Sequence, residues 1–175
     1  MRTLVTSRCT LEPLVAAHAP EMFSVLSDPA IYEFENEPPI SVEWLSLRYQ
    51  RLEVRGSADG KETWLNWVIR LPGGELAGYV QATVLPSASA CVAYELSSRY
   101  WRQGIGSSAV TAMLEELHSE YGVDTFVAAL KSANARSLGL LRSLGFSAAM
   151  EHRVAELRSE PDEVVMIKST TQSAR

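Results

Sequence analysis

The chain has 175 residues, a length that suits one domain built around a single hydrophobic core. Its formal net charge of -5 at pH 7 and its sequence pI near 5.3 argue against a nucleic-acid or anionic-membrane binder, because both classes need a net basic surface. Cys9 and Cys91 lie far apart, with no Cys/His ligand spacing, so we expect neither a disulfide nor a metal site, and both should be small buried residues. No signal-peptide pattern and no run of about eighteen apolar residues is present, so we expect a cytoplasmic protein with no membrane partner.

The first third of the chain predicts one strand followed by helices. Residues 2–10 read as a short strand, and residues 11–28 read as two helical turns broken at a central proline. The segment 31–40 holds paired prolines and three glutamates, which predicts a loop. Ser41 is expected to cap a helix that spans residues 42–55.

The middle of the chain predicts a β-hairpin. Two β-rich runs, residues 63–71 and 75–85, are separated by Pro-Gly-Gly, which favours a tight turn. Alternation in the first run places four large residues on one face: Leu65, Trp67, Ile69 and Leu71. We expect Trp44 and Trp64, like Trp67, to pack in the core rather than to contact a substrate.

The second half predicts a strand, helix, strand crossover and then a further helix. Residues 90–97 and 124–130 read as strands, and the helix between them carries a stripe at four-residue spacing: Ile105, Ala109, Met113, Leu117 and Tyr121. This order predicts a parallel crossover. A second helix follows Asn134 and ends at Gly145, two strands are expected around residues 158–163, and residues 169–175 are expected to fray.

The glycine pair in YWRQGIGSSA, residues 100–109, matches a dinucleotide-binding fingerprint in a loose reading. In such a site the strand runs straight into the first glycine, and an acidic ribose ligand ends the next strand. Here residues 97–103 separate the strand from Gly104, and Asp124 precedes its strand. These differences argue against a dinucleotide site, and the Walker pattern is absent.

The remaining interpretation of this motif is a loop that binds a diphosphate at a helix N-terminus. The backbone N–H groups of residues 103–108 would point outward there, and the positive end of the helix dipole favours an anion. Arg99 and Arg102 flank the loop, and no acidic residue occurs from Leu96 to Leu114. The alternative is that Gly104 only eases a turn and the arginines are solvated.

Two motifs resemble the GNAT N-acetyltransferase superfamily. The string AYELSSRYWRQGIGSSAV resembles its acetyl-CoA pyrophosphate loop, in the form shown by the Rim-type branch that is related to ribosomal-protein N-terminal acetyltransferases. NARSLGLLRSLGF, residues 134–146, is similar to that branch's N-x-x-S…L-G-F segment. The resemblance covers nearly the whole chain and implies one α/β domain, residues 1–168. Its mixed, mostly antiparallel sheet would have about seven strands, splayed at the centre and flanked by about four helices.

The resemblance implies acetyl-CoA as the cofactor, with no metal. In that case the backbone at Leu96 pairs with the pantetheine amides and the loop holds the pyrophosphate. The cofactor-binding residues that it implies are Leu96, Arg102, Gln103, Gly104, Ile105, Gly106, Ser107, Asn134 and Ser137. Asn134 has a second explanation as a helix N-cap. Gly104→Val is expected to weaken CoA binding while sparing the fold.

For catalysis the resemblance points to Glu95, in the central strand, as the base that deprotonates the amine; the alternative is a paired or surface-facing glutamate. The family often carries a tyrosine seven residues after the asparagine to protonate the CoA thiolate, but this sequence has Leu141 there. Ser137, Tyr100 or solvent are then left as the acid. A weak general base favours acceptor amines of low pKa, because a larger fraction of such amines is already neutral at pH 7.

The acceptor implied is a primary amine, on a protein N-terminus or a small molecule. Glu33, Glu35 and Glu37 would lie over the acceptor cleft and attract a cationic amine, unless they are merely a solvated loop. We expect direct transfer in a ternary complex, because Cys91 lies upstream of the reacting centre with no histidine nearby. A catalytically silent CoA-binding module and a dinucleotide oxidoreductase are the rival readings, and monomer and homodimer both stay open.

Overall fold

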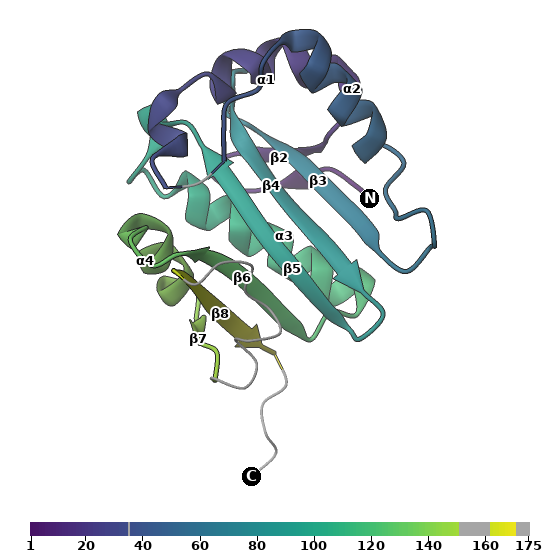
Figure 1. Ribbon diagram of the computed structural model, residues 1–175, viewed down its shortest axis with the longest axis vertical. Helices are drawn as coiled ribbons and strands as arrows, with labels where there is room; N and C mark the ends of the chain where they lie inside the picture. Colours follow the sequence, from purple (N-terminus) through teal and green to yellow (C-terminus); the bar gives the residue numbers. More distant parts are fainter. Residues whose placement is uncertain (35, 151–161, 171–175) are drawn as a thin grey trace.

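The computed structural model describes residues 1–34, 36–150 and 162–170. Figure 1 shows an open sheet with helices against its faces. The elements are β1 (Leu4–Val5), β2 (Thr10–Pro13), α1 (Ala19–Leu26), α2 (Val42–Leu52), β3 (Thr63–Arg70), β4 (Leu76–Leu85), β5 (Ser89–Leu96), α3 (Ile105–Tyr121), β6 (Thr125–Lys131), α4 (Ala135–Ser143), β7 (Ser147–Ala148) and β8 (Glu163–Ser169). Three short 3-10 turns add η1 (Ala16–His18), η2 (Pro29–Tyr32) and η3 (Ser98–Tyr100).

The described strands form one eight-stranded sheet in the order β1-β2-β3-β4-β5-β6-β8-β7. Every neighbouring pair is antiparallel except β5 and β6, which are parallel. The mixed, mostly antiparallel α/β fold and the α3 crossover are therefore confirmed. The sheet has one strand more than the seven expected, because the N-terminal segment contributes two.

The sheet splays between β5 and β6. Their pairing runs only from Ser89, opposite Thr125, to Cys91, opposite Val127. Beyond that point β5 stays paired with β4 as far as Leu96, while β6 stays paired with β8. The two parallel strands thus leave each other toward their carboxyl ends, where an α/β sheet commonly binds its ligand.

Apolar side chains lie on both faces of this sheet because the strand β3 is buried on both sides. Trp67 and Ile69 pack with α3 and α4 in the larger core, whereas Val68, between them, packs with Met22 of α1 and Leu45 of α2. The alternation predicted for residues 65–71 is confirmed. Both helix layers are consequently anchored to the same strand.

Three expectations for the N-terminal half are wrong. In place of one strand over residues 2–10 there are two, β1 and β2, and the second continues to Pro13. The Thr6 hydroxyl oxygen accepts hydrogen bonds from the N–H groups of Arg8 (3.1 Å) and Cys9 (2.9 Å) and closes the turn between them. Pro20 lies in the first turn of α1, where a missing N–H costs nothing, so it begins a helix rather than breaking one. Trp44 is 42% exposed rather than buried in the core, and Trp64 is only partly buried and belongs to neither core cluster.

The cysteines and the C-terminal strands also need correction. Cys9 is buried as expected, but Cys91 is exposed, since it alternates along β5 with buried neighbours. Of the strand pair expected around residues 158–163, β8 begins at Glu163 and pairs antiparallel with β7, whereas residues 151–161 lie outside the described ones. Ser169 still pairs with Thr125, so β8 extends one residue into the expected tail; residues 171–175 are not described.

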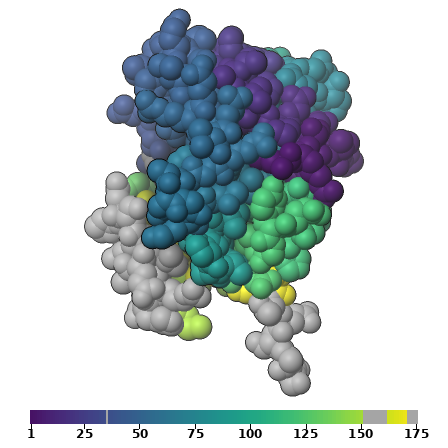
Figure 2. Space-filling view, turned by 90° about the vertical axis from the view of Figure 1, so that its right-hand side faces the viewer, coloured from purple at the N-terminus to yellow at the C-terminus, as the bar shows by residue number. Residues whose placement is uncertain are grey.

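The N-terminus is fixed to α3. Arg2 forms an ion pair of 2.8 Å with the buried Glu116, and Figure 2 shows the first residues (purple) against the second half of α3 (green). The partner of Arg2 offsets the cost of burying this carboxylate. Among the described residues no helix is long and apolar enough to cross a membrane.

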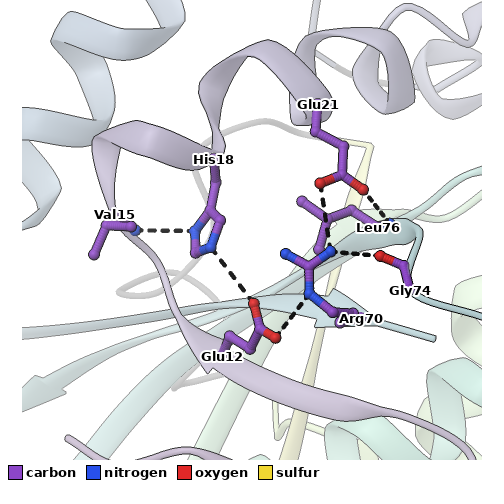
Figure 3. A network of polar contacts seen from close by, with 7 residues as sticks. All are labelled: Glu12, Val15, His18, Glu21, Arg70, Gly74 and Leu76. Carbon is purple, nitrogen blue, oxygen red and sulfur yellow. Dashed lines mark hydrogen bonds and ion pairs between the residues drawn. The ribbon is translucent and has the colours of Figure 1, made fainter. Parts of the chain in front are cut away.

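A polar network holds α1 against the sheet (Figure 3). Arg70 of β3 donates to Glu12 at 2.7 Å and to the Gly74 carbonyl at 2.6 Å, and it lies 3.4 Å from Glu21 of α1. His18 accepts a hydrogen bond from the Val15 N–H through Nδ1 at 3.2 Å. Burial lowers the pKa of His18, although the nearby Glu12 acts in the opposite direction. The network thus holds α1 in a fixed position against β3.

Candidate active site

A cavity of about 650 Å³ lies where β5 and β6 separate. It is lined by the end of β5, the turn before α3 and the first turn of α4, as the crossover topology requires. The predicted site residues that line it are Glu95, Leu96, Tyr100, Arg102, Gly104, Gly106, Ser107, Asn134 and Ser137. Gln103 and Ile105 do not, since the Gln103 side chain donates to the Arg99 carbonyl (3.0 Å) and Ile105 is buried in the core.

The N-terminus of α3 presents free backbone donors to this cavity. Gly104 is the N-cap residue, with φ of 76°, and the first intrahelical bond runs from the Ser108 N–H to the Gly104 carbonyl (3.0 Å). Within the described part of the chain, the N–H groups of Ile105, Gly106 and Ser107 therefore have no acceptor. Gly106 and Ser107 line the cavity, and free N–H groups at the positive end of a 17-residue helix fit a diphosphate.

Arg8 supports this loop from the turn between β1 and β2. Its guanidinium donates to the Gln103 carbonyl at 3.0 Å and packs over Gly104, so that a Cβ added there would lie 3.1 Å from its Nε. A valine at position 104 would also be strained at positive φ. The expectation that Gly104→Val spares the fold is therefore not supported by the structure.

Asp28 anchors the other side of the loop, and sequence reasoning missed it. One carboxylate oxygen accepts hydrogen bonds from the Ser98 N–H (2.7 Å) and the Ser97 hydroxyl (3.2 Å), and the other accepts from the Ala30 N–H (3.0 Å). Burial alone would raise the pKa of Asp28, but the hydrogen bonds from Ser98 lead a set that lowers it overall. The signal in the sequence was Asp28-Pro29, an N-cap followed by proline at the start of η2.

Trp101 contacts the edge of β5 at Leu96, which was expected to pair with the pantetheine amides. Its indole N–H donates to the Leu96 carbonyl at 2.8 Å. This carbonyl still has a second lone pair. Trp101 therefore fixes the turn without closing the strand edge to a further donor.

Asn134 caps α4, as one of its two interpretations predicted. Its side-chain oxygen accepts from the Ser137 N–H at 3.1 Å. The Tyr94 hydroxyl donates to the Ser137 carbonyl at 3.3 Å, and burial raises the pKa of Tyr94 to about 12, so this phenol stays neutral. Leu141, at the position of the family's usual tyrosine, is buried in the core and faces neither cavity.

A second cavity of about 170 Å³ adjoins the first. The residues that line both are Asn36, Arg48, Tyr79, Gln81 and Glu95. The smaller cavity extends from this junction under α2, between that helix and β4. Glu95 thus lies between a long cleft and a side-chain-sized pocket.

Glu95 has a defined polar environment. Asn36 donates a hydrogen bond to its carboxylate at 3.3 Å, and Tyr79 lies opposite it in the register of β4 and β5. Burial raises the pKa of Tyr79 well above its usual value, and the charge of Glu95 raises it further. Tyr79 is therefore a neutral donor beside the carboxylate at every physiological pH.

Tyr49 is unusual within the smaller cavity. It is 3% exposed, and its hydroxyl oxygen makes no hydrogen bond with any described residue. An unsatisfied buried hydroxyl costs about 1–3 kcal/mol, and burial accordingly raises the pKa of this phenol. A polar group that binds in the pocket would remove this cost.

The comparisons with known proteins agree with this geometry. A family model described as an acetyltransferase (GNAT) domain matches residues 8–147, which is most of the chain. The chain belongs to the GNAT acetyltransferase family. The expectation drawn from the two motifs is confirmed at this level, and the protein is assigned to an enzyme family.

Solved structures share the GNAT fold across nearly the whole chain. RimL, a ribosomal L7/L12 alpha-N-protein acetyltransferase in complex with coenzyme A, is 18% identical with a TM-score of 0.79, and the match covers 94% of this chain and 96% of that one. The ribosomal-protein-S5-alanine acetyltransferase from Vibrio fischeri is also 18% identical, with a TM-score of 0.75 and coverages of 95% and 96%. The microcin C7 self immunity acetyltransferase MccE, in complex with acetyl-CoA and AMP, is 18% identical, with a TM-score of 0.77 and coverages of 94% and 93%. No curated protein sequence matches.

The three glutamates proposed to attract a substrate of this GNAT protein have different surroundings. Glu33 forms an ion pair of 2.6 Å with Arg136 of α4. Glu37 lines the smaller cavity, and Glu35 lies outside the described residues. The charge of Glu33 is therefore neutralised by Arg136. Of the glutamates that the structure describes in this set, Glu37 lines the smaller cavity.

The possible metal ligands are scattered over the described ranges 1–34, 36–150 and 162–170. No group of three or more histidine, cysteine, aspartate or glutamate residues lies close enough there to hold an ion. Neither cysteine lines a cavity: Cys9 lies in the core, and Cys91 faces outward from β5. Burial raises the pKa of the Cys9 thiol, and partial desolvation together with the charge of Glu62 raises the pKa of Cys91, which makes both thiols poor nucleophiles.

Proposed function

We propose that this protein transfers the acetyl group of acetyl-CoA directly to a primary amine, on a protein N-terminus or a small molecule, in a ternary complex. The observation that carries the proposal is the junction of the two cavities at Glu95. Acetyl-CoA would occupy the longer cleft and the acceptor the shorter pocket. Both reactants could then be present together, with one carboxylate between them.

The residues of the longer cleft fit acetyl-CoA. The free N–H groups of Ile105, Gly106 and Ser107 would bind the pyrophosphate, with Arg102 nearby to balance its charge. The unpaired edge of β5 at Leu96 would pair with the pantetheine amides as an added strand. Bound acetyl-CoA supplies an acetyl group activated as a thioester.

Glu95 would act as the base. As the amine nitrogen forms its bond to the acetyl carbon, this carboxylate accepts the proton that the amine loses, directly or through a water. The carbon–sulfur bond breaks in the same reaction, and Ser137 or Tyr100 or solvent protonates the thiolate. Tyr79 and Asn36, beside the carboxylate, would hold it in position.

Direct transfer is favoured over a covalent acetyl-cysteine. Cys9 is buried in the core and Cys91 lies outside both cavities, so neither thiol reaches the proposed reacting centre. Initial rates measured over both substrates test this: intersecting double-reciprocal lines support a ternary complex, whereas parallel lines indicate a ping-pong route. Cys91→Ala should keep full activity.

A silent CoA-binding module is the second candidate, and the observation in its favour is Leu141, which leaves α4 without a phenol at the cleft. One experiment in two stages distinguishes the acetyltransferase from the silent module. Acetyl-CoA at about 100 times its dissociation constant should stabilise the fold by ~2.7 kcal/mol and raise Tm by roughly 5–11 °C, with NAD as the negative control. Release of CoA thiol with a panel of amines then supports the enzyme; binding without release with any amine supports the silent module.

A further inference from the structure

The smaller cavity has the size and the walls of a pocket for one amino-acid-sized molecule. Its volume of about 170 Å³ corresponds to roughly five or six waters at ~30 Å³ each, well below that of a drug-sized ligand site. Its apolar walls come from the residue after β2 and from α1 and α2: Leu14, Leu26, Trp44, Leu45 and Leu52. A compact molecule with an apolar side chain would match these walls.

Arg48 places one positive charge in this pocket. It lies on α2 in line with Trp44 and Leu52, which line the same cavity, and its guanidinium is 5.7 Å from the centroid of the Trp44 ring. No described carboxylate lies within ion-pair distance of it. The other arginines that line the longer cleft differ, since Arg136 is paired with Glu33 and Arg102 belongs to the turn before α3. Arg48 is therefore available to an anionic group of a ligand.

Tyr49 provides an independent indication of a polar ligand. It follows Arg48 on α2 and lines the same cavity, and its buried hydroxyl has no partner among the described residues. A carboxylate offers two oxygens and several lone pairs, so it can accept from a guanidinium and a phenol at once. Both groups are donors at neutral pH, and an anion satisfies both.

The pocket also holds acidic groups. Glu95 lies at the junction with the cofactor cleft, and Glu37 also lines the cavity. An ammonium or amine group is favoured beside these carboxylates, and a carboxylate beside Arg48 and the Tyr49 hydroxyl, which line the same cavity. The pocket therefore carries the charge pattern of a molecule with an amine and a carboxylate close together.

We propose that the acceptor is a free amino acid with an apolar side chain, whose carboxylate is bound by Arg48 and the Tyr49 hydroxyl while its amine faces Glu95. This inference rests on the proposed acetyl transfer and selects among its acceptors. A protein N-terminus has a peptide carbonyl where an amino acid has its carboxylate, so it leaves the guanidinium without an anionic partner. Transfer to the amino acid yields an N-acetyl amino acid and free CoA.

The test compares L-leucine with L-leucinamide, in which a neutral amide replaces the carboxylate; because this also lowers the pKa of the amine, rates are compared per unprotonated amine. With saturating acetyl-CoA, kcat/KM for leucine should exceed that for leucinamide by about tenfold or more, as expected for a charge-assisted pair. Arg48→Gln should remove this preference, and Arg48→Lys should keep part of it. Arg51→Gln, on the same helix but away from both cavities, should leave the ratio unchanged.

Tyr49→Phe separates a binding role from a structural one. It removes a hydroxyl that has no partner in the protein, so stability should be kept or raised, while KM for leucine rises several-fold and KM for leucinamide does not. Equal values for the two acceptors, or equal losses of both in Arg48→Gln, would overturn the inference. Acetylation of a peptide N-terminus in preference to leucine would overturn it as well.

A binding measurement distinguishes the failure of this inference from that of the proposed function. Leucine titrated calorimetrically into the CoA-saturated protein should bind, leucinamide should bind about tenfold more weakly, and Arg48→Gln should bind both equally. Transfer to other amines with no binding of leucine refutes the amino-acid acceptor alone. Binding of leucine with no transfer to any amine keeps the pocket assignment and refutes the proposed acetyltransferase activity.

Discussion

The guanidinium of Arg136 lies 4.0 Å from the centroid of the Trp101 ring. Trp101 comes from the turn before α3, and Arg136 comes from the first turn of α4 on the other side of the longer cleft. The same guanidinium is 5.5 Å from the Phe34 ring and forms the ion pair with Glu33. Three segments that are distant in sequence thus meet at one arginine above the cofactor cleft.

Replacing this arginine should loosen all three segments at once. We expect Arg136→Ala to lower the free energy of unfolding by roughly 1 kcal/mol, because a cation–π contact and a partly exposed ion pair are lost. Arg136→Lys should recover little, since the flat stacking on Trp101 needs a guanidinium. Denaturant unfolding measures the loss, and the exposed Arg142 of α4, changed to alanine, serves as the control.

The fold was predictable from local patterns, because its strands and helices are long and regular. The alternation of Leu65, Trp67 and Ile69 and the four-residue stripe from Ile105 to Leu117 place these residues in the core, and they lie there. The prediction of a single strand over residues 2–10 was wrong because the two strands present, Leu4–Val5 and Thr10–Pro13, are too short to show a period. The turn between them depends on one hydroxyl, that of Thr6.

The site was predictable only where a motif marks it. The turn from Arg102 to Ser107 and the cap at Asn134 follow from glycines and capping residues that are contiguous in sequence. Arg48 and Tyr49 gave no such signal, because on a helix a pocket-lining arginine and an exposed one look alike. Their place at the smaller cavity follows from how α2 packs on β4.

Arg102 offers a test of the pyrophosphate site in which stability and binding change in opposite directions. Its φ of 59° is unfavourable for any residue except glycine, so Arg102→Gly should keep or raise the free energy of unfolding by up to about 1 kcal/mol. Acetyl-CoA affinity should fall about three- to tenfold, with a weaker dependence on salt, because one charge near the phosphates is lost. Thermal shift and calorimetry measure the two effects.

Arg55→Gly is the matched control for that experiment. Arg55 has nearly the same φ, 58°, but lies after α2 and lines neither cavity. It should show the same change in stability with unaltered acetyl-CoA affinity. Unchanged affinity in Arg102→Gly would instead place the pyrophosphate away from the start of α3.

Glu95→Gln should separate chemistry from binding. Loss of a general base lowers turnover about 10²–10⁴-fold, whereas acetyl-CoA, held mainly by the backbone of the α3 turn, should bind as before. The amide also keeps the volume and an acceptor for Asn36. Single-turnover rates and calorimetric affinities measure the two effects, with Glu115→Gln on the exposed face of α3 as control. Full activity in Glu95→Gln would show that solvent deprotonates the amine.

Asp28→Ala should destabilise the fold in a pH-dependent way, because three donors lose their acceptor. We expect a loss of about 1–3 kcal/mol at pH 7. Hydrogen bonds hold the pKa of Asp28 below its unfolded value, so the folded state binds fewer protons and the stabilisation is complete above about pH 4. It is then lost as the pH falls through the folded-state pKa.

The difference in unfolding free energy between the native chain and Asp28→Ala should therefore be constant from pH 5 to 7 and shrink toward pH 3. Asp59→Ala is the comparison, since hydrogen bonds also lower the pKa of this carboxylate but it lies in an exposed loop remote from η3. Because Asp28 joins the start of η2 to the Ser97 and Ser98 backbone, its loss should also weaken acetyl-CoA binding. Asp59→Ala should leave that affinity unchanged, which distinguishes an anchored cofactor turn from a general loss of stability.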